Sequence, residues 1–384
     1  MSSHDPRWVL QGDLPGRPSR GLIVGLVAAG VCLLTSFGFV VVRGGVGTFA
    51  LALVLALAPV PVLLAGVLAL DRLEPEPRRD LVFAFAWGAG VAVLFAGLLN
   101  SLGVLYLTRV EHLDIAGAQN IGATLGAPLV EETLKGLVLL GLLRFRRQEL
   151  DGPTDGIIYA SMVGLGFAMS ENVSYYVKAI VDGGAGELAA TVILRGVISP
   201  LAHPLFTSMT GIAVAYAAQR RTGRAPIILA GLAAAMFLHG LWNGMASYLG
   251  IVGLAFAYLV LALILGALIW VVVAERRRVV HLILAYLPGY RETGLVSEVD
   301  LGMLSSMRNR RQARHWARVN GGANAARAMS DYQFAATELV LLHQRLERQI
   351  IDGEAFTRRQ HALLHLMDLA RRAFPRPAKG GAGF

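Results

Sequence analysis

The chain contains few of the residues on which disulfide-bonded, cysteine-metal or ordinary soluble proteins depend. Its 384 residues include one cysteine, Cys32, inside an apolar run, which excludes a disulfide framework and a cysteine metal cluster. Charged residues make up only 16%, and the His-Glu-x-x-His signature of helical zinc sites is missing. A metal ion would therefore need histidine and carboxylate ligands from separate segments.

Apolar residues are abundant instead. They make up 55% of the chain, with a mean hydropathy of +0.56, outside the usual balance of a soluble domain. Eight apolar segments reach the roughly 20 residues that a helix needs to cross a bilayer, and lipid offers an unpaired backbone no partners. The predicted spans are 21–42, 47–70, 81–105, 123–143, 156–177, 194–218, 226–248 and 251–274. The sequence thus predicts an all-α, polytopic integral membrane protein.

Arginine and lysine residues predict the orientation of these spans, because they concentrate on the cytoplasmic side. The N-terminus, alternate connections and the start of the tail carry fifteen of them, whereas the other connections carry four. The first span has no cleavage site after its apolar core, so we interpret it as a retained anchor. We expect both termini to be cytoplasmic. The predicted domains are a cytosolic segment 1–20, a transmembrane domain 21–274 and a cytosolic tail 275–384.

The tail has a different composition. Residues 275–384 hold 18 Lys and Arg against 10 Asp and Glu, and apolar positions within 331–350 and 355–374 recur at helical spacing. Gly321, Gly322, Asp352 and Gly353 are the expected breaks. A small helical hairpin or bundle is predicted. Its basic surface is either simply solvated or suited to the anionic inner leaflet, and we expect no specific nucleic-acid partner.

Ionisable and amide side chains interrupt four of the predicted spans, where such residues mark functional sites by default. They are Glu131, Glu132, Lys135, Glu171, Asn172, His203, His239 and Asn243. At 1.5 Å per helical residue, the predicted orientation places five of these groups on four helices roughly 8 to 14 Å below the outer face: Glu131, Glu171, His203, His239 and Asn243. The sequence predicts one cluster in the outer half of the bilayer.

A purely structural role is the alternative for each residue taken singly. Glu131 lies one turn from Lys135 and could form an ion pair with it, and His203 or His239 could hydrogen-bond between helices. One lysine, however, does not neutralise three buried acids. The cluster is therefore expected to bind protons, water or a metal ion.

Two chemistries suit this set. A glutamate could act as general base, with His239 and Asn243, one turn apart on one face, stabilising an oxyanion. Alternatively, Glu132, Glu171, His203 and His239 could bind zinc. Adjacent Glu131 and Glu132 are about 100° apart on a helix, so only one faces the cluster.

Prolines and glycines surround the cluster. Pro200 and Pro204 bracket His203 and predict a broken helix beside a water-filled pocket. Four glycines near the cluster, Gly164, Gly166, Gly240 and Gly244, are expected to allow close helix packing.

Four motifs in order on consecutive spans resemble the PrsW family of intramembrane proteases. They are Glu-Glu-x-x-Lys (Glu131, Glu132, Lys135), Phe-x-x-x-Glu-Asn (Phe167, Glu171, Asn172), the span-six histidine (His203) and His-x-x-x-Asn (His239, Asn243). The resemblance covers roughly residues 50 to 250, includes "LEPEPRRD" before the third span, and leaves out the tail.

The resemblance implies hydrolysis of small membrane proteins, such as anti-sigma factors, in a bacterial plasma membrane. It implies Glu131 as base, Glu132 paired with Lys135 or acting as second carboxylate, and Glu171 and His203 binding water or a metal such as zinc. His239 and Asn243 would bind the oxyanion, and Lys135, Asn172 and Phe167 would support the site. The distantly similar CAAX-prenyl and bacteriocin-processing proteases carry a histidine where this chain has Glu171 and use a glutamate to activate water.

Two other classes of protein would also collect such residues. A proton-coupled transporter would place them at the midplane between inverted repeats, and no repeat is evident in this sequence. A non-catalytic membrane scaffold would not need the motifs intact.

Overall fold

The computed structural model describes residues 19–70 and 75–374, which are helical and contain no strand. The membrane-type helices are α2 (Arg20–Leu57), α3 (Val60–Leu70), α4 (Arg78–Ala86), η1 (Trp87–Ala92), α5 (Val93–Arg109), α6 (Ile115–Ile121), η2 (Gly122–Gly126), α7 (Ala127–Phe145), η3 (Arg147–Glu149), α8 (Pro153–Val192), η4 (Ile193–Ile198), α9 (Ala202–Ala218) and α10 (Arg224–Tyr286). They are followed by η5 (Leu287–Thr293), α11 (Glu298–Leu304), α12 (Met307–Glu347) and α13 (Gly353–Ala373).

Contacts divide the described chain into two compact units. The membrane unit comprises residues up to 272, and the tail unit begins at residue 273, within α10. Most of the predicted N-terminal segment 1–20 lies outside the described residues.

Five helices in the described residues are long and apolar enough to cross a membrane: Arg20–Leu70, Arg78–Arg109, Pro153–Ala218, Arg224–Gly250 and Val252–Thr293. The fourth predicted span, 123–143, falls on η2 and α7 and is not among the five. Glu131, Glu132 and Lys135 lower the hydropathy of that helix. Large apolar side chains such as Val24, Val27 and Leu34 are exposed on α2, as expected of a helix that faces lipid.

Helices α2, α8 and α10 each reverse direction at a glycine with positive φ. These glycines are Gly45, Gly184 and Gly250, respectively. The rings of Phe37 and Phe49 are 5.2 Å apart, although twelve residues of straight helix span about 18 Å. In the same way Trp242 and Tyr258 are 5.1 Å apart across the third glycine. Glycine has no Cβ to oppose this backbone conformation.

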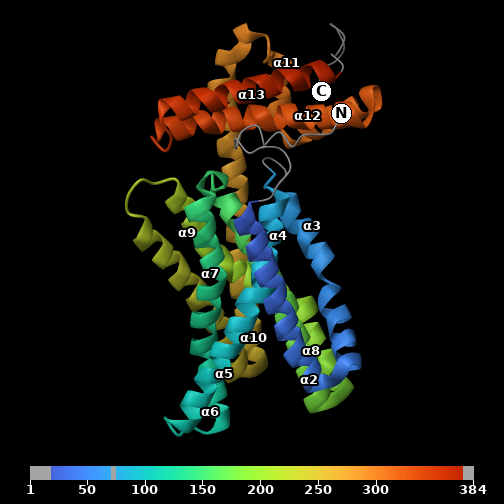
Figure 1. Cartoon of the computed structure of the whole chain (residues 1–384), viewed down its shortest axis with the longest axis vertical. Helices are drawn as coiled ribbons and strands as arrows, with labels where there is room; N and C mark the ends of the chain where they lie inside the picture. The colour runs from blue at the N-terminus through green and yellow to red at the C-terminus, as the bar shows by residue number, and fades with distance from the viewer. Residues whose placement is uncertain (1–18, 71–74, 375–384) are drawn as a thin grey trace. The chain divides into compact units, whose positions relative to one another are not determined.

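Helix α8 packs against α2, α4 and α9, and Figure 1 shows it beside α2. Every residue from Asp155 to Ser170 is buried, so this stretch has no face toward lipid. Glycines make the crossings close. A Cβ on Gly164 would lie 2.6 Å from the backbone nitrogen of Pro204, and one on Gly166 would lie 2.1 Å from the Phe85 carbonyl oxygen.

The helical path is interrupted before His203, as the two prolines predict. The π-helical turn η4 ends at Ile198, a non-helical turn covers 199–201, and α9 starts at Ala202. Pro204 therefore lies in the first turn of α9, where its missing N–H breaks no helical hydrogen bond. Two further π-helical turns, η1 and η2, lie in the same unit, and such turns are frequent at functional sites.

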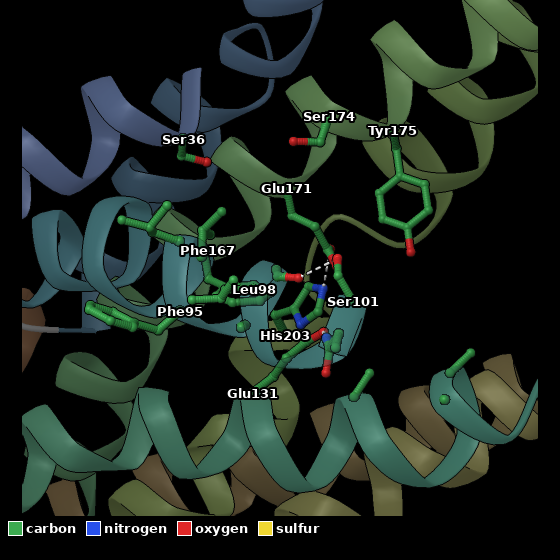
Figure 2. A pocket seen from close by; sticks show the side chains of 18 of the residues that line it. Ser36, Phe95, Leu98, Ser101, Glu131, Phe167, Glu171, Ser174, Tyr175 and His203 are labelled. Atoms are coloured by element: carbon green, nitrogen blue, oxygen red, sulfur yellow. Dashed lines mark hydrogen bonds and ion pairs between the residues drawn. The ribbon is translucent and has the colours of Figure 1, made fainter. Parts of the chain in front are cut away.

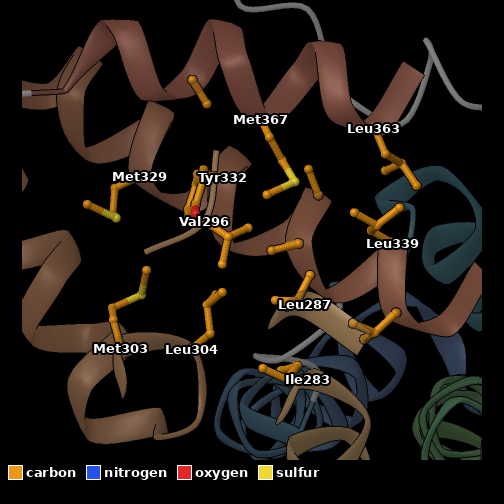
Figure 3. Packing of buried hydrophobic residues seen from close by; sticks show 14 of the residues in the cluster. Ile283, Leu287, Val296, Met303, Leu304, Met329, Tyr332, Leu339, Leu363 and Met367 are labelled. Atoms are coloured by element: carbon orange, nitrogen blue, oxygen red, sulfur yellow. The ribbon is translucent and has the colours of Figure 1, made fainter. Parts of the chain in front are cut away.

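The tail unit is a helical hairpin extended by α13, which packs along α12 (Figures 1 and 3). Helix α12 reverses at Gly322, and Asp352 caps α13, so both expected breaks are confirmed. Ile283, Tyr332, Leu339 and Met367 belong to its apolar core (Figure 3).

We predict that Gly164→Ala destabilises the membrane unit by about 1–3 kcal/mol, because the added methyl group overlaps backbone atoms of α9 that cannot move independently. Thermal unfolding in detergent measures the effect. The matched control is Gly141→Ala on α7, where a Cβ meets nothing within 4 Å and helix propensity gives a gain of about 0.5–1 kcal/mol. Equal unfolding temperatures for the two variants would contradict the close crossing.

Candidate active site

The polar residues of the four predicted spans meet in one cluster inside the membrane unit. Helix α7 supplies Glu131, Glu132 and Lys135, α8 supplies Glu171, α9 supplies His203 and α10 supplies His239. Figure 2 shows Glu131, Glu171 and His203 pointing toward one another from three helices. The predicted convergence of these residues is therefore present in the structure.

Lys135 lies at the centre of the cluster and is fully buried. Its Nζ is 2.8 Å from Glu132 Oε1, 3.4 Å from Glu131 Oε2 and 2.9 Å from His203 Nδ1. The same ammonium lies 3.9 Å from the centre of the Phe167 ring. Phe167 also contacts the His203 imidazole, with 5.1 Å between the ring centres, so it supports both groups.

The ammonium fixes the tautomer of His203, because an ammonium only donates hydrogen bonds. Nδ1 must accept from Lys135, and the ring proton is on Nε2, 3.0 Å from Glu171 Oε2. A neutral His203 therefore has both nitrogens engaged.

Glu132 is held on all sides. Its Oε1 accepts from Lys135 and from Nδ1 of His239 at 3.0 Å, and its Oε2 accepts from the Thr207 hydroxyl at 2.9 Å. Its side chain is completely buried. These bonds orient His239, whose Nε2 is left unprotonated in the neutral ring.

Glu131 faces the other way, as expected for neighbours on a helix. Its Oε1 accepts from Asn100 Nδ2 at 3.3 Å, and its Oε2 is 3.9 Å from His239 Nε2. It is the carboxylate of this pair that lines a cavity of about 930 Å³. Glu171, His203, His239 and Asn243 line the same cavity, whereas Lys135 lies behind its wall.

Glu171 is paired with a cation that sequence reasoning missed. Arg195, on η4, forms an ion pair with Glu171 and donates from Nε to Asn172 Oδ1 at 2.8 Å. Its guanidinium stacks 3.8 Å from the centre of the Tyr175 ring. In the sequence, Arg195 counts as a charge of an outer connection. Its position at the start of an apolar span was the signal that could have identified it.

The cluster has one uncompensated negative charge among these side chains. Glu131, Glu132 and Glu171 carry three negative charges, and Lys135 and Arg195 carry two positive charges. Glu131 is the least compensated carboxylate, since its nearest cation lies at 3.4 Å and its closest hydrogen-bond donor is a neutral amide. A proton or a bound cation would balance the charge at this position.

Glu131, His203 and His239 each offer one ligand atom, all within 4.8 Å of one another. Three nitrogen and oxygen ligands suit zinc, and each histidine also contacts a carboxylate, as metal-bound histidines do. The set predicted from the sequence has Glu132 and Glu171 in place of Glu131, and in the structure these two carboxylates contact the histidines. An ion would nevertheless have to displace Lys135 or Glu171 from His203. The set fits a metal in ligand type and spacing, but His203 has no free nitrogen.

Asn243 lines the cavity, but its Nδ2 donates to the Ala123 carbonyl at 2.8 Å. Only its second N–H is left for an oxyanion. The predicted partnership of Asn243 and His239 therefore requires a change of protonation at His239, whose proton in the neutral ring lies on Nδ1 toward Glu132.

The chain is similar to known proteins over the part that contains this cluster. The model of a family described as "PrsW family intramembrane metalloprotease" matches residues 76–274, about half of the chain. The "Protease PrsW" of Geobacillus kaustophilus is 28% identical over 186 residues, which are 48% of this chain and 75% of the relative. The protein of the same name from Clostridioides difficile is 30% identical over 158 residues, 41% of this chain and 62% of the relative.

A third relative, "Protease PrsW" of Oceanobacillus iheyensis, is 28% identical over 115 residues, which are 30% of this chain and 49% of the relative. No solved structure matches the chain. The family match spans the helices that supply all the residues of the buried cluster and ends at residue 274, at the start of the tail unit. The chain therefore belongs to the PrsW family of intramembrane metalloproteases, whose curated members are named proteases.

Proposed function

We propose that the protein hydrolyses peptide bonds of small membrane proteins, of the anti-sigma-factor type, with Glu131 as the general base. The observation that carries this proposal is the position of Glu131. It lines the cavity, is the least compensated of three buried carboxylates and lies 3.9 Å from the unprotonated nitrogen of His239. A carboxylate that needs one proton is suited to take it from water.

In the proposed reaction, Glu131 removes a proton from water, and the water oxygen attacks the peptide carbonyl carbon. The second N–H of Asn243 stabilises the oxyanion, together with Nε2 of a His239 ring that has bound a proton from solvent before the reaction and keeps it throughout. The C–N bond then breaks, and the proton held by Glu131 passes to the leaving amine. Glu171 and Arg195 hold His203 in place, and Glu132 orients His239.

Lys135 supplies the fixed positive charge of this reaction. Its ammonium contacts two of the three candidate metal ligands, Glu131 and His203, so the protein provides its own cation where a metal would bind. A divalent ion beside this ammonium would be repelled by it. These contacts favour the glutamate-driven route over metal-assisted hydrolysis.

We also propose eight transmembrane spans with both termini in the cytoplasm. The reversals at Gly45, Gly184 and Gly250 and the alternation of basic residues support this topology. The tail would then lie beside the anionic inner leaflet of a bacterial plasma membrane, where its basic surface is favoured.

Replacing Glu131 by glutamine is expected to reduce cleavage by about 10²- to 10⁴-fold, because the amide cannot accept the proton of water. Cleavage of a quenched fluorescent single-span peptide in proteoliposomes measures the rate.

Glu132→Gln is expected to abolish cleavage as well. It should also lower the unfolding temperature, since it weakens the buried contacts to Lys135, His239 and Thr207. The matched control is Glu187→Gln, at an exposed residue. Normal cleavage by both active-site variants would refute the proteolytic function.

Metal analysis of the purified protein separates the two routes of water activation. The glutamate-driven route predicts far less than one zinc per chain, with no difference between the wild type, His203→Ala and the exposed control His361→Ala. Mass spectrometry of the metal content makes the measurement. Stoichiometric zinc that is lost only in His203→Ala would assign the metal-assisted route and overturn the role of Lys135 as the resident cation.

Cysteine labelling tests the topology. In a Cys32→Ala background, Glu187→Cys and Thr222→Cys place single thiols at exposed positions on either side of α9. A membrane-impermeant maleimide should label Glu187→Cys in intact cells and Thr222→Cys only after lysis. The reverse pattern would invert the orientation, and labelling of both from outside would remove the span between them.

A further inference from the structure

Asn100 is a polar residue of the cavity that none of the four motifs contains. It lies on α5, where it interrupts the apolar sequence "VLFAGLLNSLGVLYLTR", and it approaches the cluster from a fifth helix. Its Nδ2 lies 3.3 Å from Glu131 Oε1. The residue therefore contacts the carboxylate that the proposed function uses as base.

The contact with Glu131 fixes which way the amide of Asn100 points. An ionised carboxylate only accepts hydrogen bonds, so the NH₂ group must face Glu131 and the carbonyl must face away from it. That carbonyl oxygen, Oδ1, is buried and has no hydrogen-bond partner among the described residues. The side chain thus has one end bound to the base and the other end unsatisfied at a cavity wall.

A buried polar atom without a partner is unfavourable, and native structures retain few of them, often where a ligand completes the bonding. The missing partner must be a hydrogen-bond donor that can enter the cavity. An extended peptide carries such a donor, its backbone N–H, next to every carbonyl. A peptide held on Asn100 Oδ1 would lie beside the carboxylate held on Asn100 Nδ2.

We propose that Asn100 is a positioning residue, which orients Glu131 through its NH₂ group and accepts a backbone N–H of the extended substrate through its carbonyl. The inference rests on the proposed function and deepens it. It assigns substrate alignment to α5, a helix that the recognised motifs leave without a role. Because the donor is a backbone group, this contact selects an unwound peptide segment and is indifferent to its side chains.

Asn100→Leu tests the proposal, since leucine has a similar size and removes both hydrogen bonds. We expect a loss of about 10- to 100-fold in kcat/KM, as for hydrogen bonds to charged groups. The acid limb of the pH–rate profile should move to higher pH, because the ionised form of Glu131 loses a donor. The unfolding temperature should stay the same or rise, because the variant also removes an unsatisfied buried oxygen. The matched control is Thr108→Val on the same helix, whose hydroxyl bonds only to carbonyls of its own helix.

Peptides in which single non-scissile amides are replaced by esters test the substrate contact. One ester position should reduce kcat/KM in the wild type and have no further effect in Asn100→Leu, because the same hydrogen bond is already lost. An additive effect at every position would overturn the substrate contact and leave only the contact with Glu131.

If Asn100→Leu cleaves at the wild-type rate with the wild-type pH profile while Glu131→Gln is inactive, the inference is overturned and the proposed function stands. A loss of activity that merely follows a lower unfolding temperature would assign Asn100 a structural role and would also overturn it. If Glu131→Gln and Glu132→Gln cleave normally, the proposed function itself fails, and the inference fails with it.

Discussion

The buried ammonium of Lys135 is the interaction on which the rest of the membrane unit depends. An isolated charge inside a membrane protein is very unfavourable, and Lys135 is stable there only because Glu131, Glu132 and His203 surround it. Those partners in turn hold Glu171 and His239, so one cation connects α7, α8, α9 and α10. Removing Lys135 would leave three buried carboxylates with Arg195 as their one cation, which explains why the polar residues form a network.

Such a network requires helices that approach closely, because hydrogen bonds tolerate little variation in length. Glycine provides this approach along α8, which is buried on all sides between Asp155 and Ser170. The backbone of Gly164 lies directly against that of His203 and Pro204, at the point where α9 begins. The interruption at 199–201 turns the chain so that His203 enters the cluster from the first turn of α9, next to Arg195 on the preceding π-helical turn. The close helix crossing at Gly164 and the polar contacts of His203 therefore lie at the same place, the start of α9.

The two adjacent glutamates have different environments because the helix rotates by about 100° between them. Glu132 points into the bundle and accepts three hydrogen bonds, whereas Glu131 points into the cavity and keeps a weakly paired oxygen. The two histidines are divided in the same way. Their contacts with Glu132, Glu171 and Lys135 orient the rings, and both rings also line the cavity. A single helical step thus produces one structural and one reactive carboxylate.

The sequence by itself determined that the protein is helical and membrane-embedded, which residues cluster, and that the helix breaks at His203. The lengths of the apolar segments and the positions of the prolines can be read directly from the sequence. The same is true of the ionisable residues inside apolar segments, which must be paired because burying an unpaired charge is unfavourable. Only the tertiary structure decided that Glu131 and not Glu132 faces the cavity, that Arg195 supplies a second cation and that Asn100 contacts the base. It also brings Glu131 together with His203 and His239 as a candidate ligand set, which the sequence-based prediction did not contain. These outcomes depend on how helices far apart in sequence rotate and pack against one another, and local sequence does not specify that rotation.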